Sequence, residues 1–305
     1  MEVSFMWWVW FNAFIVAMVL VDLLVFHKKD HVVSVKEALV WSFVWITMAL
    51  LFNLFILLNA GKQPALEYFT AYIIEKSLSV DNLFVFIVIF NYFRVPPQYQ
   101  HRVLFIGVIV VMVLRAVFIL AGIRLVEEFH WLLYVFGIFL VYIAVKMVSE
   151  KDKEYDPSKN IVVRLFSKLM PMSLEYKNHN FFERVNGKLA VTQLFVVLMV
   201  INFVDLVFAI DSIPAVFAIT RDPFIVYTSN IFAILGLRAL YFAVSGVLRM
   251  FKYLKYGLAL ILAVVGVKMV LIDIVKVPTL YSLIFIVTVL AVSILFSVVK
   301  EKRRG

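Results

Sequence analysis

The chain of 305 residues is 64% hydrophobic, has a mean hydropathy of +1.00 and carries a formal net charge of +9. Soluble domains are about 45–50% apolar, so this composition predicts a polytopic membrane protein, with residues 1–305 forming one domain. The absence of cysteine excludes disulfides, thiolate metal sites and iron–sulfur clusters. The basic residues lie mostly between apolar runs, which favours a role in membrane topology over nucleic-acid binding.

Nine apolar runs are long enough to cross a bilayer, which takes about 20 residues. The first run lacks the basic start and the small-residue cleavage site of a signal peptide, so we expect it to remain as a helix. The expected fold is therefore all-α, a polytopic membrane bundle of about nine transmembrane helices. The runs are residues 5–26, 37–58, 66–93, 103–123, 130–149, 189–219, 224–247, 254–273 and 278–299.

Positively charged residues alternate between the connections. More than one lies after the first, third, fifth and seventh runs and in the C-terminal tail, whereas the other connections hold one each, at Lys62, Arg124, Arg221 and Lys276. Because cytoplasmic loops are enriched in Lys and Arg, this pattern predicts an N-terminus outside and a C-terminus in the cytoplasm.

The connection over residues 150–188 is the longest, and it begins with a charged, proline-containing segment typical of a solvated linker. Within it, Ile161 to Met170 has the pattern of a short amphipathic helix on the membrane surface. A plain cytoplasmic linker is the alternative.

Two acidic motifs occur inside apolar runs. Glu75-Lys-Ser-Leu-Ser-Val-Asp81-Asn82 lies in the third run, and Asp205-Leu-Val-Phe-Ala-Ile-Asp211-Ser212 lies in the sixth. In both motifs two acids are six residues apart, and a small polar residue follows the second acid. Carboxylates inside a bilayer are costly and therefore mark function.

The order of charged residues around the motifs occurs twice. Arg115 and Val145-Lys146-Met147-Val148 follow the first motif, and Arg238 and Val267-Lys268-Met269-Val270 follow the second. We therefore expect two copies of a three-helix unit, in opposite orientations because each unit crosses three times. Such inverted repeats are typical of secondary transporters, with the site near the midplane between the repeats. Chance similarity between apolar helices is the alternative. The parts are residues 1–58 (two leading helices), 66–149 (first repeat), 150–188 (linker), 189–273 (second repeat) and 278–305 (last helix and basic tail).

The spacing of the acids sets a geometric problem. Six residues of a straight helix turn the chain by roughly 600°, so the two acids of a motif would lie about 120° apart. Either each acid faces a different neighbour, or the helix is interrupted. We expect an interruption, because the third run is long and polar at its centre and because Pro214 follows Asp211 and Ser212.

The motifs offer hard oxygen ligands for a metal ion. Carboxylate, amide and hydroxyl oxygens suit Mn²⁺, Mg²⁺ or Ca²⁺. The five histidines lie at the ends of runs or in connections, so we expect no zinc or haem site within the membrane. The expected metal ligands are Glu75, Asp81, Asn82, Asp205, Asp211 and Ser212.

Arg115 and Arg238 are the expected counter-charges, because four carboxylates cannot all ionise side by side in a low dielectric. Uptake of protons when the ion leaves would give metal/proton antiport. Structural ion pairs are the alternative role for the two arginines.

Four further polar residues are expected to support the ligands. The alternatives are structural pairing for Asp22, interhelical hydrogen bonds for Asn53 and Asn202, and extension of the Lys76 side chain to the membrane interface. Asn230, at the start of the seventh run, is expected near the surface. The four supporting residues are Asp22, Asn53, Lys76 and Asn202.

Several stretches resemble the TerC family, and its Alx branch in particular. They are the two acidic motifs, the second continuing to Phe217, together with Thr228-Ser-Asn-Ile-Phe-Ala-Ile-Leu-Gly-Leu-Arg-Ala-Leu-Tyr241, Lys255-Tyr-Gly-Leu-Ala and Asn180-Phe-Phe-Glu-Arg-Val-Asn-Gly187. The resemblance covers nearly the whole chain. It implies metal-ion homeostasis, and manganese export for the Alx branch, with Glu75, Asp81, Asp205 and Asp211 as the ion-handling residues. The tellurium resistance in the family's name does not follow from four acids, because an oxyanion would require basic residues.

The expected function is export of a divalent cation, Mn²⁺ before Ca²⁺ or Mg²⁺, across the inner membrane of a bacterium. We expect no enzymatic activity and no prosthetic group. Two alternatives stay open. One is an intramembrane aspartyl-type enzyme, which needs two aspartates close enough to share a proton. The other is a non-transporting membrane partner that acts through residues 150–188.

Overall fold

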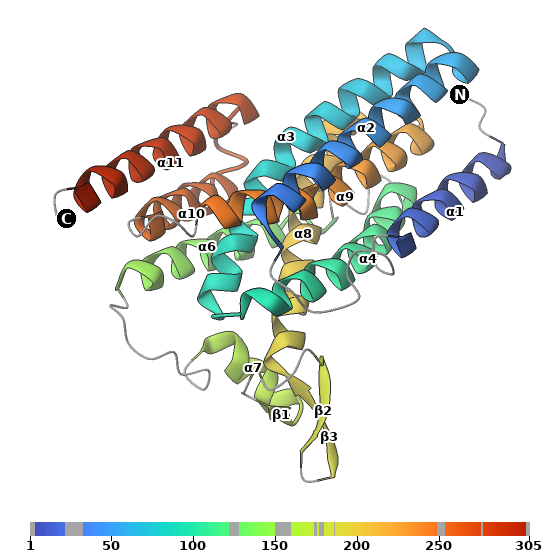
Figure 1. The fold of residues 1–305 in the computed structure, drawn as a ribbon. Helices are drawn as coiled ribbons and strands as arrows, with labels where there is room; N and C mark the ends of the chain where they lie inside the picture. Colours follow the sequence, from blue (N-terminus) through green and yellow to red (C-terminus); the bar gives the residue numbers. More distant parts are fainter. Residues whose placement is uncertain are drawn as a thin grey trace.

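A computed structural model describes residues 4–21, 33–121, 128–149, 160–173, 176, 180–185, 187–248, 254–275 and 277–302. Figure 1 shows a bundle of helices, with three short strands gathered at one end of helix α8. The helices are α1 (Phe5–Val21), α2 (Val35–Ala60), α3 (Lys62–Tyr92), α4 (Pro97–Ala121), α6 (Leu132–Ser149), α7 (Ile161–Leu169), α8 (Gln193–Phe217), α9 (Pro223–Leu248), α10 (Leu254–Val270) and α11 (Thr279–Lys302). The strands are β1 (Met172–Ser173), β2 (Phe182–Val185) and β3 (Lys188–Thr192).

Each of the nine predicted runs overlaps one helix in the part of the chain that the structure describes, with ends that differ by up to several residues. Helices α2, α4, α6, α8 and α9 have the length and hydropathy of membrane-spanning helices, and α1, α10 and α11 contribute shorter apolar segments. Helix α3 has 31 residues and carries the charged motif at its centre. The chain is therefore a mostly helical, multi-pass membrane bundle.

The predicted interruption of the two motif helices was wrong. Helix α3 is continuous through the first motif, and α8 is continuous through the second, with Pro214 inside it. Pro214 lies in the final turn of α8, where the helix is about to end and the missing N–H removes a single hydrogen bond. In α3 the hydroxyls of Ser77 and Ser79 donate to carbonyls one turn earlier, so these polar side chains are satisfied within the helix.

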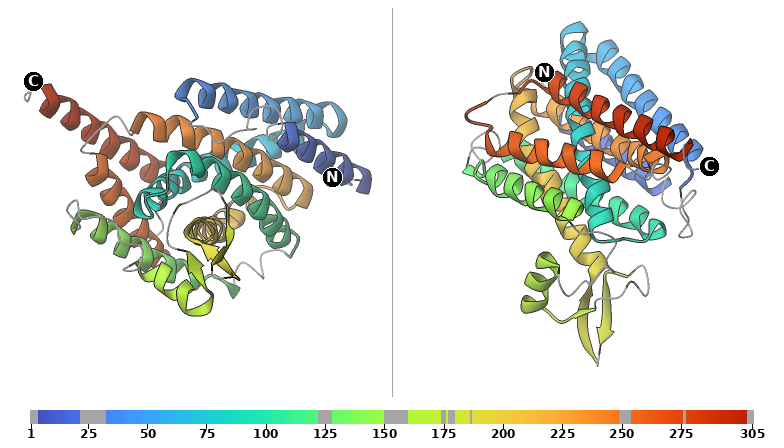
Figure 2. Two further views of the ribbon diagram at one scale, coloured as in Figure 1. Left: turned by 60° about the horizontal axis from the view of Figure 1, so that its bottom comes forward. Right: turned by 90° about the vertical axis from the view of Figure 1, so that its left-hand side faces the viewer.

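Helix α8 lies at the centre of the bundle. Its apolar segment is 78% buried, whereas that of α2 is 17% buried. The left view of Figure 2 looks along α8 and shows other long helices around it. The second acidic motif, which is on α8, therefore lies in the interior of the protein.

The helices that end the two predicted repeats, α6 and α10, pack together through glycines. A Cβ added at Gly137 would lie 2.6 Å from the carbonyl oxygen of Gly266, and one added at Gly266 would lie 2.7 Å from that of Gly137. Helix α3 also packs on α9, and α4 packs on α8. The helices of the two predicted units are thus interleaved, while their inverted relation stays a prediction.

The segment predicted as a linker contains more regular structure than expected. Helix α7 confirms the predicted short helix, and the Asn160 side chain caps its start by accepting from the backbone N–H of Val162 at 3.0 Å. The strand order is β1-β3-β2, with β1 parallel and β2 antiparallel to β3. Gly187, between β2 and β3, has a φ of +78°, which favours glycine.

The sheet is joined directly to the membrane helices. Strand β3 ends at Thr192, whose hydroxyl accepts from the backbone N–H of Phe195 at 3.3 Å and caps α8. The hydroxyl of Tyr176 donates to the carbonyl oxygen of Phe93 at 2.9 Å, and Arg102 lies over the ring of Phe181. These contacts attach the segment to Phe93, at the end of α3, and to Arg102 on α4.

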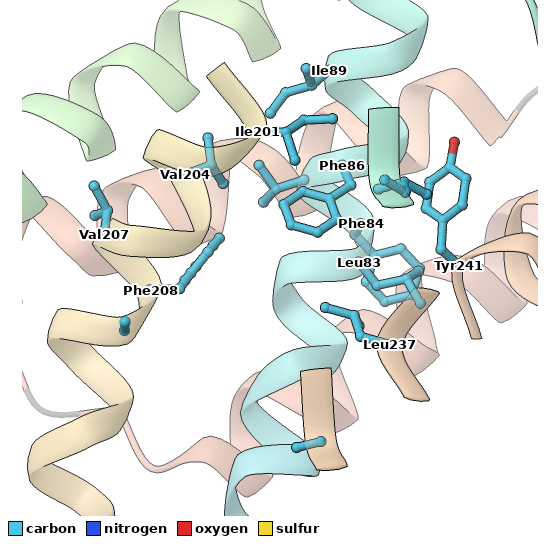
Figure 3. Close-up of a cluster of buried hydrophobic side chains, with 14 of the residues drawn as sticks. Leu83, Phe84, Phe86, Ile89, Ile201, Val204, Val207, Phe208, Leu237 and Tyr241 are labelled. Carbon is cyan, nitrogen blue, oxygen red and sulfur yellow. The ribbon is translucent and has the colours of Figure 1, made fainter. Parts of the chain in front are cut away.

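A hydrophobic core fills the space between α3, α8 and α9 beside the acidic motifs, as Figure 3 shows. This packing fixes the three helices relative to one another next to the charged groups. The side chains there are Leu83, Phe84, Phe86 and Ile89 from α3, Ile201, Val204, Val207 and Phe208 from α8, and Leu237 and Tyr241 from α9.

Candidate ion-binding site

Arg115 of α4 joins the first acids of the two motifs. Its Nη1 lies 3.2 Å from Oε2 of Glu75, and its Nε lies 3.0 Å from Oδ2 of Asp205. All three side chains are at most 3% exposed. Because an isolated charge is costly in a low dielectric, this buried triad is a single electrostatic unit that ties α3, α4 and α8 together.

The other oxygen of Glu75 is held by neutral donors. Oε1 accepts from the hydroxyl of Ser212 at 3.1 Å and from Nδ2 of Asn230 at 2.8 Å. The expectation that Asn230 lies near the surface was wrong, since the residue is fully buried on α9. Ser212, an expected metal ligand, is bonded to Glu75 in this structure.

The second acids of the motifs line a small cavity whose wall also includes Glu75, Arg115 and Ser212. Asp81 and Asp211 face it together with Asn82 and with Lys268 of α10. The cavity volume is about 20 Å³, which is close to the space that one water molecule needs. Helices α3, α4, α8 and α10 therefore meet at a confined polar site, where Asp81 and Asp211 lie with Lys268 and the Glu75–Arg115 ion pair in one cavity wall.

The helical spacing explains this division of the acids. On the continuous helix α3, Glu75 and Asp81 point in directions about 120° apart. Glu75 reaches Arg115 on α4 and Asn230 on α9, whereas Asp81 faces the cavity beside α10. The alternative in which each acid faces a different neighbour thus describes this structure.

The two predicted counter-charges lie in different surroundings. Arg115 pairs with one acid from each motif, rather than with both acids of one motif. Arg238 lies 3.4 Å from Nε2 of His101, and its guanidinium carbon lies 5.4 Å from the ring centre of Phe105. Arg115 is therefore the counter-charge of both Glu75 and Asp205.

Three of the predicted supporting residues lie among the described residues, and Asp22 lies outside them. Lys76 Nζ lies 3.5 Å from the carbonyl oxygen of Ala233 on α9. Asn202 donates to the carbonyl oxygen of Leu198 on its own helix at 2.7 Å. The Oδ1 atoms of Asn53 and Asn202 are buried and have no hydrogen-bond partner among the described residues. Only the Lys76 bond joins another helix, and none of the three residues lines the cavity of Asp81 and Asp211.

Sequence reasoning did not place Lys268 or His130 near the site. Lys268 was visible as part of the repeated Val-Lys-Met sequence, but its position beside the second acids depends on how α10 packs. At the start of α6, His130 Nε2 lies 3.2 Å from Oδ1 of Asp273, and the hydroxyl of Tyr134 donates to the same carboxylate. This partly exposed cluster links the N-terminal end of α6 to the C-terminal end of α10.

The donor set limits what the site can bind. In the described part of the chain, no three Asp, Glu, His or Cys side chains lie together as a ready metal-binding group. A cation in the cavity would be held by Asp81 and Asp211, with Asn82 as the amide oxygen donor next to them. Two carboxylates with additional neutral oxygens suit hard divalent cations.

The chain was compared with known proteins. The model of the integral membrane protein TerC family matches residues 60–305. The chain belongs to the TerC family. No solved structure matches it.

Relatives of similar length come from several bacteria. A membrane protein of Myxococcus xanthus is 48% identical over 97% of this chain and 92% of its own length. Two relatives are named "Putative membrane-bound redox modulator Alx". The one from Salmonella typhi is 44% identical over 95% of this chain and 93% of its own length. The one from Escherichia coli K12 is 43% identical over 90% of this chain and 89% of its own length.

Proposed function

We propose that this TerC family protein exports a divalent metal cation, Mn²⁺ first among the candidates, through the cavity between α3, α8 and α10. The observation that carries the proposal is the meeting of Asp81 and Asp211, one from each acidic motif, in one confined cavity. Buried carboxylates at membrane depth form ion pathways in many transporters.

The first and second acids have different tasks in this proposal. Glu75 and Asp205 hold α3 and α8 to α4 through Arg115, so their charges are balanced inside the protein. Asp81 and Asp211 supply the charge that attracts the cation. The motifs' resemblance to the Alx branch of the family implies Mn²⁺ as the ion, and the hard oxygen donors agree with it.

Exchange against protons is the coupling that we propose. Two carboxylates in one small cavity repel each other, and this repulsion favours proton uptake after a cation has left. The proposed orientation has the C-terminus in the cytoplasm, as the distribution of Lys and Arg indicates. We place the protein in the inner membrane of a bacterium.

An intramembrane aspartyl-type enzyme is the second candidate, because Asp81 and Asp211 line the same cavity. The cavity volume of about 20 Å³ argues against it, since a peptide bond and its flanking side chains need far more room. The redox role in the printed name of the Alx relatives would need chemistry other than thiol exchange here, because the chain has no cysteine.

Transport by the purified protein tests the proposal. Proteoliposomes loaded with a Mn²⁺-quenched dye should show Mn²⁺ flux with the wild-type chain, and an imposed proton gradient should drive it. Asp211→Asn and Asp81→Asn should abolish flux while the protein still inserts and stays monodisperse. Glu67→Gln is the matched control, because Glu67 is also on α3 but pairs with Gln63 away from the cavity.

The outcome separates the candidates. Absence of Mn²⁺ flux from the wild-type protein, with peptide cleavage that requires both aspartates, would replace transport by the enzyme. Normal flux in Asp211→Asn would remove the second motif from the ion path.

A further inference from the structure

We propose that Lys268 is a tethered cation that competes with the transported ion for Asp81 and Asp211, and that this competition promotes release of the ion. The inference rests on the proposed function, because it assigns a positioning residue to the same site. It gives a task to a charged residue that the sequence motifs alone do not explain.

The first step is the placement of charge around the cavity. Lys268 is half-buried on α10, and it lines the cavity opposite the acids of α3 and α8. Its ammonium group interacts electrostatically with both Asp81 and Asp211. The other charged residues in the cavity wall, Glu75 and Arg115, already pair with each other. Lys268 is therefore the cation that lines the cavity with the second acids and is not paired with Glu75 as Arg115 is.

The second step is the size of the cavity. A volume of about 20 Å³ holds roughly one water-sized group. This space remains beside the Lys268 side chain, so a divalent cation bound there would lie next to the ammonium group and be repelled by it. The divalent ion carries twice the charge and is attracted more strongly at equal distance. Because the two cations repel each other, binding of the ion favours movement of the Lys268 side chain away from the carboxylates, and return of the ammonium group favours departure of the ion.

The third step is a comparison within the chain. Lys146 occupies the matching place in Val145-Lys146-Met147-Val148, yet it lies elsewhere. Its Nζ donates to the hydroxyl of Tyr92 at 3.3 Å and lies 5.1 Å from the centre of that ring. The lysine of the second repeat alone lines the acidic cavity, so the repeat by itself does not account for its position.

Binding of Mn²⁺ to the purified full-length protein tests the inference. Isothermal titration should give a Kd at least about fivefold lower for Lys268→Gln than for wild type, the lower end of usual coupling between charged sites. Release into excess chelator, followed by stopped flow, should slow by a similar factor. Lys268→Arg keeps the positive charge and should stay within about twofold of wild type. Lys146→Gln is the matched control and should leave the Kd unchanged.

A second variant keeps the test valid if Lys268→Gln folds poorly. The chain has no cysteine, so Lys268→Cys provides a single reactive thiol. Modification with 2-aminoethyl methanethiosulfonate restores a positive charge and should weaken Mn²⁺ binding again. Methyl methanethiosulfonate adds a neutral group to the same folded protein and should leave binding tight.

Failure of the inference is distinct from failure of the proposed function. If wild type binds Mn²⁺ and Lys268→Gln binds it equally or more weakly, the inference is wrong and the transport proposal stands. Equal effects of the two thiol reagents would also overturn it. If neither wild type nor any variant binds Mn²⁺, both proposals fall.

Discussion

Asn230 donates a hydrogen bond of 2.8 Å to Glu75, although the two residues are 155 positions apart in the chain. The bond connects α9 to α3 at the oxygen of Glu75 that Arg115 does not contact. With Ser212, three helices supply the donors of one carboxylate. Such complete satisfaction is what a buried carboxylate requires. It indicates that Glu75 has a structural role and holds the helices beside the proposed ion path.

Loss of this bond should lower stability. Asn230→Ala removes one donor from a buried carboxylate, and we expect a decrease in the free energy of unfolding of about 1–3 kcal/mol. Thermal unfolding in detergent measures it. Asn59→Ala is the control, because the Asn59 side chain bonds the Phe55 carbonyl on an exposed surface and its loss should change little. Equal melting temperatures for both variants would show that Asn230 does not hold Glu75.

Arg115 should be among the least replaceable residues of the bundle. Arg115→Met leaves Glu75 and Asp205 as buried carboxylates without their counter-charge, which costs about 3–5 kcal/mol. We expect little monodisperse protein in size-exclusion chromatography. Neutralising all three residues at once, with Arg115→Met, Glu75→Gln and Asp205→Asn, should recover more folded protein than Arg115→Met alone. A triple variant that folds worse than the single one would contradict the triad.

The glycines between α6 and α10 should tolerate no side chain. Gly137→Ala and Gly266→Ala each place a Cβ less than 3 Å from a backbone oxygen of the other helix, so the helices must separate. We expect a loss of about 1–3 kcal/mol, the usual cost of overpacking. Gly107→Ala is the control, because its nearest heavy atom would lie at 3.8 Å, an ordinary contact distance. A larger loss of melting temperature in Gly107→Ala would refute the close approach.

Ion competition should follow the hardness of the donors. Because the carboxylates of Asp81 and Asp211 and the amide oxygen of Asn82 outnumber the single thioether of Met269 in the cavity wall, we expect Mn²⁺ uptake to be reduced by excess Ca²⁺ or Mg²⁺ and scarcely by Cu⁺, which prefers sulfur ligands. Flux of Mn²⁺ into proteoliposomes with each competitor measures the order. Stronger inhibition by Cu⁺ than by Ca²⁺ would contradict an oxygen site and would point to the thioether of Met269 in the cavity wall.

Much of the architecture follows from the composition of the chain. Apolar length locates the long helices, and the Ile161–Met170 pattern predicts α7 because a surface helix must show one apolar face. The small sheet was missed, although Asn186-Gly187 between strand-like flanks is a hairpin signal. The charged composition of residues 150–188 predicted a solvated linker, and the hairpin signal of this pair was not weighed against it.

The site could be predicted only in part. Buried acids in a membrane protein identify the functional helices, but the partner of each acid depends on packing between distant segments. Helical spacing shows that Glu75 and Asp81 diverge. It does not show that Arg115 would join Glu75 to Asp205, or that Asn230 and Lys268 would approach from α9 and α10. The interruption expected at Pro214 is absent, since α8 continues through the motif and through the proline to Phe217.

The junction at Thr192 has a mechanical meaning. Since strand β3 passes into α8 with no loop between them, the hairpin is a rigid extension of the central helix outside the bundle, as Figure 1 shows. A small tilt of α8 is amplified at the hairpin tip in proportion to the length of that lever. In a chain without cysteine, a fluorophore attached through Arg184→Cys on β2 would report the position of the second acidic motif from outside the membrane.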